Sequence, residues 1–166
     1  MKSIHGDSSG SLRRFVLNWN RLIIIGIIIL LSGTNPAQAP GSIVSWGSDI
    51  WGQADVPTDT DFLQVASGRN HGLALKADGS IMSWGPDGYG QVSDTPTGIG
   101  FKQVAASGYN SLALSADGSI VSWGSEFNGS VVDTPTYTGF VQVAGGLEYD
   151  SLGLKDVGSI VSWGWD

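Results

Sequence analysis

Carboxylates occupy one register of this sequence, two residues after the glycine of a recurring Ser-Trp-Gly tripeptide. The four acids are Asp49, Asp87, Glu126 and Asp166, at steps of 38, 39 and 40 residues. Two interpretations are open. A side-chain oxygen at this place can cap the turn that follows it. Alternatively, the repetition sets the carboxylates along an arc on one face, where their negative field attracts a basic partner or a cation.

Aromatic side chains occupy a neighbouring register, four residues after the same glycine. This register reads Trp51, Tyr89 and Asn128. Because it falls in a loop, we expect Trp51 and Tyr89 to be exposed, and exposed aromatic side chains are favoured as contact anchors. Ordinary packing within the loop is the alternative. Together the two registers define a candidate partner-binding face: Asp49, Trp51, Asp87, Tyr89, Glu126 and Asp166.

The sequence does not bring together a catalytic histidine and nucleophile. His71 is the one histidine outside the N-terminal region, and its equivalents in the following repeats are Asn110 and Asp150. A position that accepts all three side chains suits a structural hydrogen bond. The residue after His71 is Gly72, whereas Ser111 stands in a repeat without histidine, so no nucleophile and base pair is expected. We therefore predict that the protein is not an enzyme.

Signals for a metal, a cofactor or a nucleic acid are weak or missing. Asp59 and Asp61 alternate as in some calcium loops, but the remaining ligand positions of such a loop are absent. The phosphate-binding GxxxxGK[ST] pattern is absent, and without cysteine there is no disulfide or thiolate site. From residue 40 onward there are 14 acidic and 4 basic side chains, which repel nucleic acid phosphates. We expect no metal, no cofactor and no nucleic acid partner.

These side chains are carried by a repeat. The heptapeptide GSIVSWG occurs at residues 41–47, 118–124 and 158–164, and GSIMSWG occurs at 79–85. Alternating β-branched and polar residues with an aromatic one predict a strand for each copy. The array divides into units at residues 41–78, 79–117 and 118–157, with a partial unit at 158–166. One tryptophan of each copy is expected to pack against the neighbouring unit: Trp46, Trp84, Trp123 and Trp163.

Each unit is expected to hold two further strands, and no window has the period of a helix. The second strand reads FLQVAS, FKQVAA or FVQVAG, and the third reads HGLALK, SLALS or SLGLK. The third strand joins the next SWG strand across Asp-Gly pairs at 78–79 and 117–118, which predict type I′ hairpin turns. In the third unit Val157 replaces the aspartate. A fourth, short strand is a weaker prediction around Val56, Val92 and Val132.

The first 39 residues form a separate segment. Residues 1–21 are polar and basic, and residues 22–31 read LIIIGIIILL. Ten apolar residues are about half of the ~20 that a membrane-spanning helix needs, so a signal peptide is favoured over a true span. We expect a secreted, periplasmic or cell-surface protein. The alternative is membrane anchoring through an uncleaved segment at residues 22–31.

The repeat resembles that of the regulator of chromosome condensation family, especially a short-repeat bacterial branch that includes a secreted β-lactamase inhibitor. The resemblance covers residues 41–166 and rests on the SWG strand, the Gly-Gln pairs at 52–53 and 90–91, the Val-Ala pairs and the SLAL strand with its Asp-Gly turn. It implies an all-β fold, a β-propeller to which each unit adds about one blade. Three units and a terminal strand are too few to close a ring of 4 to 8 blades. We therefore expect a partial propeller that can self-associate through its open blade edges.

The function predicted from these features is that of an exported, non-enzymatic protein-binding module that uses loops of the propeller face. Functions vary within the resembled family, so the fold alone does not supply an activity. The partner's identity is unknown, and the acidic register favours a basic protein. A glycan-binding surface protein is one alternative, based on Trp51 and Tyr89. A non-functional fragment of a longer propeller is another.

Overall fold

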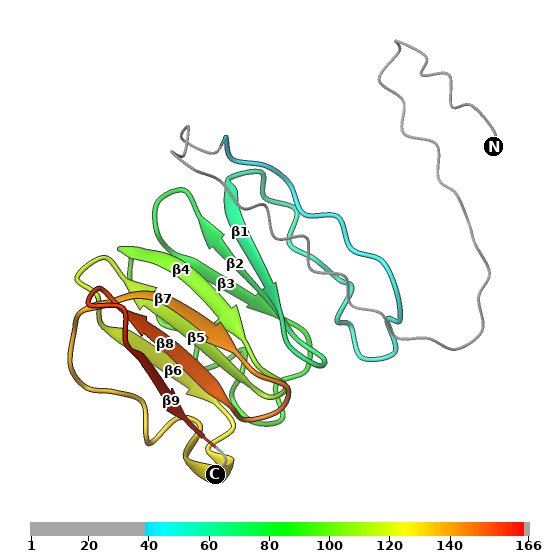
Figure 1. The fold of residues 1–166 in the computed structure, drawn as a ribbon. Coiled ribbons are helices and arrows are strands. Elements are labelled where there is room, and N and C mark those ends of the chain that lie inside the picture. Colours follow the sequence, from blue (N-terminus) through cyan, green and yellow to red (C-terminus); the bar gives the residue numbers. More distant parts are fainter. Residues whose placement is uncertain (1–38, 165–166) are drawn as a thin grey trace, which may run out of the picture.

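The computed structural model describes residues 39–164, and these residues form three sheets of three strands each. Figure 1 shows the sheets side by side, in chain order. We call each sheet a blade. The strands of blade 1 are β1 (Phe62–Ser67), β2 (Gly72–Lys76) and β3 (Ile81–Trp84). Those of blade 2 are β4 (Phe101–Ala106), β5 (Asn110–Ser115) and β6 (Ile120–Gly124). Those of blade 3 are β7 (Phe140–Gly145), β8 (Ser151–Lys155) and β9 (Ile160–Trp163).

Each blade is an antiparallel meander in which consecutive strands pair. The SWG strand is the last strand of a blade, and it pairs with the third strand of the preceding sequence unit, as in the partners Leu73 and Ser83. The short helix η1 (Phe127–Gly129) lies in the loop after β6. The loops after the first and third strands share one end of the blades, which we call the loop face. The Asp-Gly turns lie at the opposite end.

The first SWG copy is an exception, and the strand prediction for residues 41–47 is wrong. Its backbone makes a single bridge, between Gly41 and Phe62. The other copies pair with the SLAL strand before them, and within residues 39–164 no such strand precedes residue 41. Trp46 is consequently 73% exposed, so the expected inward packing of that tryptophan is also wrong. Trp123 and Trp163 are buried and Trp84 is half-buried, as expected for this register.

The prediction of a fourth strand is wrong as well. Val92 lies in a turn, Val132 lies in another, and Val56 lies in an irregular segment. The turn at Val92 is held by the side chain of Asp87, whose Oδ1 accepts the Val92 backbone N–H at 2.8 Å. A backbone N–H that is capped in this way is not available for a strand ladder.

The Asp-Gly hairpins exist, but they are not the type I′ turns that the sequence predicts. The Gly79 N–H donates to the Lys76 carbonyl at 3.0 Å, and Gly79 has a φ of +83°. Asp78 is not among the residues with positive φ, which a type I′ turn requires at both central positions. The geometry is a three-residue loop that ends in a left-handed glycine. Val157 fits the same place in blade 3 because only Gly158, with a φ of +84°, needs the left-handed conformation.

The core lies at the two junctions between blades. At the first junction leucines and an isoleucine of blade 1 pack against Val104 and Trp123 of blade 2. At the second, the equivalent residues of blade 2 pack against Phe140, Val143 and Trp163 of blade 3. The burial of these side chains supplies the main force that holds the blades together.

A glutamine clamp adds polar contacts to each junction. The Gln64 amide donates to the Val104 carbonyl at 3.1 Å, and its Oε1 accepts the Val104 N–H at 3.0 Å. Gln103 binds Val143 in the same way, at 2.8 and 3.0 Å. Because each clamp satisfies both polar groups of one peptide position, it fixes the register of one blade on the next.

Candidate functional site

The carboxylate register acts as a turn cap in the first two loops. Asp49 Oδ1 accepts the Ala54 N–H at 2.9 Å, and Asp87 Oδ1 accepts those of Val92 at 2.8 Å and Ser93 at 3.0 Å. The pKa of Asp87 is lowered because the Ser93 and Val92 backbone hydrogen bonds stabilise its carboxylate. Both aspartates are also exposed, so a capping role leaves their charge on the surface.

The third and fourth positions of this register differ. In the Glu126 loop the turn is closed by Ser125, whose Oγ accepts the Phe127 N–H at 3.3 Å. Glutamate is one methylene longer than aspartate, and the Glu126 side chain extends into solvent. Asp166 lies outside the described residues.

The aromatic register is exposed, as its loop position predicts. The Trp51 N–H donates to Gln53 Oε1 at 2.8 Å, and the Tyr89 N–H donates to Gln91 Oε1 at 2.7 Å. These bonds fix the backbone and leave the rings outside, where Trp51 is 65% exposed and Tyr89 is 51% exposed. Asn128, the third member, has a φ of +54°. Asparagine tolerates this left-handed backbone better than an aromatic residue does.

Four rings form an aromatic row across the loop face. The Tyr89 and Tyr109 centroids lie 5.5 Å apart, those of Tyr109 and Tyr149 lie 5.7 Å apart, and those of Phe127 and Tyr149 lie 6.0 Å apart. We did not predict this row from the sequence, although Tyr109 and Tyr149 share one register at a step of 40 residues. Contacts of this kind stabilise the face beyond the burial of ring area.

The aromatic row already contacts one positively charged side chain of the same protein. The Arg69 guanidinium carbon lies 5.6 Å from the Tyr109 ring centroid, and Arg69 Nη1 lies 3.6 Å from Glu148 Oε1. A ring face and a carboxylate therefore bind a single positive charge on this surface. Both ion-pair partners are substantially exposed, so the pair contributes little to stability.

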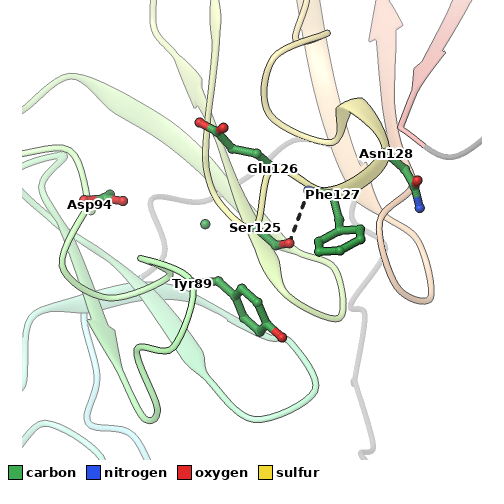
Figure 2. Close-up of a pocket in the computed structure, with 7 residues that line it drawn as sticks. Tyr89, Asp94, Ser125, Glu126, Phe127 and Asn128 are labelled. Carbon is green, nitrogen blue, oxygen red and sulfur yellow. Dashed lines mark hydrogen bonds between the residues drawn. The ribbon is translucent and has the colours of Figure 1, made fainter.

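A hollow of about 690 Å³ lies beside the row, between the loops that follow β3 and β6 (Figure 2). The aromatic residues Tyr89 and Phe127 and the acidic residues Asp94 and Glu126 contribute to its lining. The hollow thus brings together two predicted residues, Tyr89 and Glu126. Asp49, Trp51 and Asp87 do not line it. Asp94 and Phe127 belong to it although the sequence did not single them out.

His71 does meet a serine, contrary to the sequence prediction. Its Nε2 lies 3.0 Å from Ser111 Oγ, because the stacking of blades 1 and 2 brings adjacent repeats together. Both side chains are buried, at 2% and 0% exposure. Burial lowers the pKa of His71 to about 4, and Nδ1 has no partner within residues 39–164. The pair lacks both an orienting acid and access for a substrate, so this geometry suits a structural contact.

The alternating aspartates form an ion pair. Asp61 Oδ2 lies 3.3 Å from Lys76 Nζ, and Asp59 Oδ2 lies 3.4 Å from it. The pKa of Lys76 is raised, chiefly by its hydrogen bond to Asp61. Among the residues that the structure describes, no three histidine, aspartate or glutamate side chains gather in a way that could hold a metal ion.

The regulator of chromosome condensation (RCC1) repeat matches two segments of the chain, residues 62–91 and 101–130. Each segment runs from the first strand of a blade into the loop after its third strand. No curated protein sequence matches the chain significantly.

Solved structures share the arrangement of blades. The ectodomain of the Physcomitrella patens receptor kinase CR4 has a TM-score of 0.60 and 24% identity, over 72% of this chain and 35% of that chain. Yeast RCC1 (Prp20), solved with Kap60 bound, has a TM-score of 0.58 and 23% identity, over 75% and 40%. Prp20p from Saccharomyces cerevisiae, in a separate structure, has a TM-score of 0.56 and 23% identity, over 72% and 40%. The fold is part of a β-propeller.

The propeller array spans 35 to 40% of the length of these structures. At 23 and 24% identity, the similarity to these structures shows the fold alone. The resemblance to a short-repeat bacterial branch stays a prediction. So does the N-terminal signal segment, because residues 1–38 lie outside the described residues. Within the described part, no helix is long and apolar enough to cross a membrane.

Proposed function

We propose that this propeller array is an exported, non-enzymatic module that binds a basic protein on its loop face. The observation that carries the proposal is the hollow beside the aromatic row. Two aromatic residues, Tyr89 and Phe127, and two acidic residues, Asp94 and Glu126, line it, and within residues 39–164 neither acidic side chain forms an ion pair. Aromatic rings and carboxylates together favour a lysine or arginine side chain.

Two further observations support this proposal. Arg69 rests over Tyr109 beside Glu148 on the same face, which is a local example of how this surface accommodates a positive charge. Among the related folds, yeast RCC1 (Prp20) was solved with Kap60 bound, and the Prp20p study names binding to Gsp1p and histones. Yeast Prp20, which has a similar fold, therefore binds other proteins.

A peptide array that compares basic, neutral and acidic peptides of equal length tests the binding face. We expect basic peptides to bind, and an Asp94→Asn, Glu126→Gln variant to weaken binding about tenfold, or about 1.4 kcal/mol. An Asp117→Asn, Asp156→Asn variant removes the same charge at the hairpin turns, at the opposite end of the blades, and serves as the control. Equal weakening by both variants would reduce the effect to net charge, and a preference for acidic peptides would contradict the proposal.

Export is tested separately. The support for it is the run LIIIGIIILL at residues 22–31, preceded by a basic segment. A reporter enzyme that is active only outside the cytoplasm, fused after residue 45, should be active. Retention of an inactive fusion in the cytoplasm would refute export and leave the binding proposal untouched.

Glycan binding remains the second candidate, favoured by the exposure of Trp51 and Tyr89. A glycan array distinguishes it from protein binding. No bound glycan, or binding that survives in a Trp51→Ala, Tyr89→Ala variant, would exclude this candidate.

A further inference from the structure

The outer face of blade 3 is built like the buried faces of blades 1 and 2. Leu73 and Leu112 stand at one repeat position and are 0% exposed, whereas Leu152 at the same position is 42% exposed. Ile81 and Ile120 are 8% and 7% exposed, whereas Ile160 is 70% exposed. The side chains are the same and only the covering blade is missing within the described residues. Blade 3 therefore presents a preformed half of a junction.

The other half of a junction is present on blade 1. Val104 and Val143 are 1% and 3% exposed against the preceding blade, whereas Val65 at their position is 55% exposed. The glutamine clamp is also divided between the two ends. Gln142 on β7 corresponds to Gln64 and Gln103 but is exposed. Val65 corresponds to Val104 and Val143, whose backbone N–H and carbonyl groups bind the clamp glutamines.

The SWG strand that would belong to a junction between these two faces occurs twice in the chain. Residues 41–47 and 158–164 have the identical sequence GSIVSWG. The second copy contains β9, which pairs with β8, whereas the first copy makes a single bridge to Phe62. That bridge resembles the Phe101 to Gly79 hydrogen bond of 3.1 Å at the first junction. Within residues 39–164, residues 41–47 are therefore attached to blade 1 as a last strand without the other strands of its blade.

From these observations we propose that two copies of this chain associate by strand exchange, in which β8 of one copy pairs with residues 41–47 of the other in place of its own β9. The register of β8 with β9 pairs Leu152 with Ser162 and Leu154 with Ile160. The same register places Ser45 opposite Leu152 and Ile43 opposite Leu154. Because the two heptapeptides are identical, β8 gains the same hydrogen bonds and side chains from either strand.

The exchanged strand brings blade 1 of its own copy with it, and that is what favours the exchange. Val65 then covers Leu152 and Leu154, as Val104 covers the equivalent leucines of blade 1. The Gln142 amide reaches the Val65 peptide position as the other two clamps do. Burial of this apolar surface is the net gain over the unexchanged chain. Reciprocal exchange would join two arrays of three blades into six, within the range of closed propellers.

An engineered disulfide tests the register of the exchange directly, because the chain has no cysteine of its own. A full-length Leu152→Cys chain and a full-length Ser45→Cys chain are refolded together and oxidised. Residues that face each other across paired strands are close enough for a disulfide. We expect a disulfide-linked dimer from the mixture and none from either chain alone. Ser48→Cys, which is out of register, replaces Ser45→Cys in the control and should give no such dimer.

A second variant blocks the exchange without touching residues 41–47. A Leu152→Cys, Ser162→Cys chain can hold β9 on β8 by an internal disulfide, since these residues are partners in the native register. By light scattering we expect a monomeric mass when this variant is oxidised and twice that mass when it is reduced. A monomeric mass for the unmodified chain at all concentrations would overturn the proposal. So would equal cross-linking by Ser45→Cys and Ser48→Cys. This inference is independent of the proposed binding function.

Discussion

At the scale of single residues, the buried histidine is the clearest source of pH dependence. Burial lowers the pKa of His71 to about 4, from an ordinary value of 6.5. Between these values the unfolded chain binds a proton that the folded chain excludes, so stability rises with pH in that window. Stability from this residue is complete above pH 6.5 and is lost as the pH falls toward 4.

The first prediction follows from this linkage. Lowering the pH from 7 to about 4 should remove on the order of 3 kcal/mol of unfolding free energy through His71. A His71→Asn variant, which places the residue of Asn110 at the equivalent position, should show a much flatter dependence above pH 5. Urea unfolding at pH 7, 6 and 5 measures the difference. Parallel slopes for the two proteins would show that His71 is not the titrating group.

At the scale of elements, the hairpin turns require a glycine more than they require an aspartate. Gly79 and Gly158 have φ values of +83° and +84°, and the aspartate of the first turn is replaced by Val157 in the last. Asp78 contributes through its side chain, which accepts the Ser80 N–H at 2.8 Å. This hydrogen bond determines neither the positive φ of the glycine nor the type of turn. The turn of blade 3 forms without it, because Val157 stands in place of the aspartate.

The second prediction compares these two glycines. Gly158→Ala should cost about 1 to 2 kcal/mol, the strain of a left-handed alanine, because a Cβ there meets nothing within 4 Å. Gly79→Ala should cost more, because its Cβ would lie 2.7 Å from the Gly100 backbone nitrogen. Denaturant unfolding of the two variants measures this contrast. Equal losses would mean that the turn, and not the close approach to the next blade, limits the substitution.

At the scale of the whole molecule, the part of the array at residues 39–164 is a series of junctions with an open face at either side. Gln103, which lies in a junction, and Gln142, which lies on an open face, can therefore be compared as a matched pair. Gln103 clamps Val143 at 2.8 and 3.0 Å, whereas Gln142 is exposed on blade 3. Removal of Gln103 leaves both polar groups of a peptide position in a junction without a partner.

The third prediction uses this pair. Gln103→Ala should cost about 1 to 3 kcal/mol at every protein concentration. Gln142→Ala should change stability by less than about 0.5 kcal/mol in dilute solution, and should destabilise the protein only at concentrations where copies associate. Thermal unfolding over a dilution series separates the two effects. If the effect of Gln142→Ala does not depend on concentration, the open face of blade 3 is not an interface.

The sequence by itself determined the all-β class, the repeat and the three strands of each blade. These features are local: alternation along FKQVAA or SLALS and a turn glycine are readable within ten residues. The exposed position of Trp51 and Tyr89 was predictable for the same reason, since both stand in a loop between strands. The Asp-Gly turns also predicted that the third strand of a unit pairs with the next SWG strand, and the three blades confirm this pairing.

Only the tertiary structure decided which residues meet across the repeats. His71 reaches Ser111, Tyr109 stacks on Tyr149, and Tyr89 joins Glu126 in one hollow, all over separations of about 40 residues. Such contacts depend on how one blade is rotated against the next, and no local pattern encodes that rotation. For the same reason, residues 41–47 and residues 158–164 differ in structure. Their sequences are identical, but a strand forms only where the surrounding blades supply a partner.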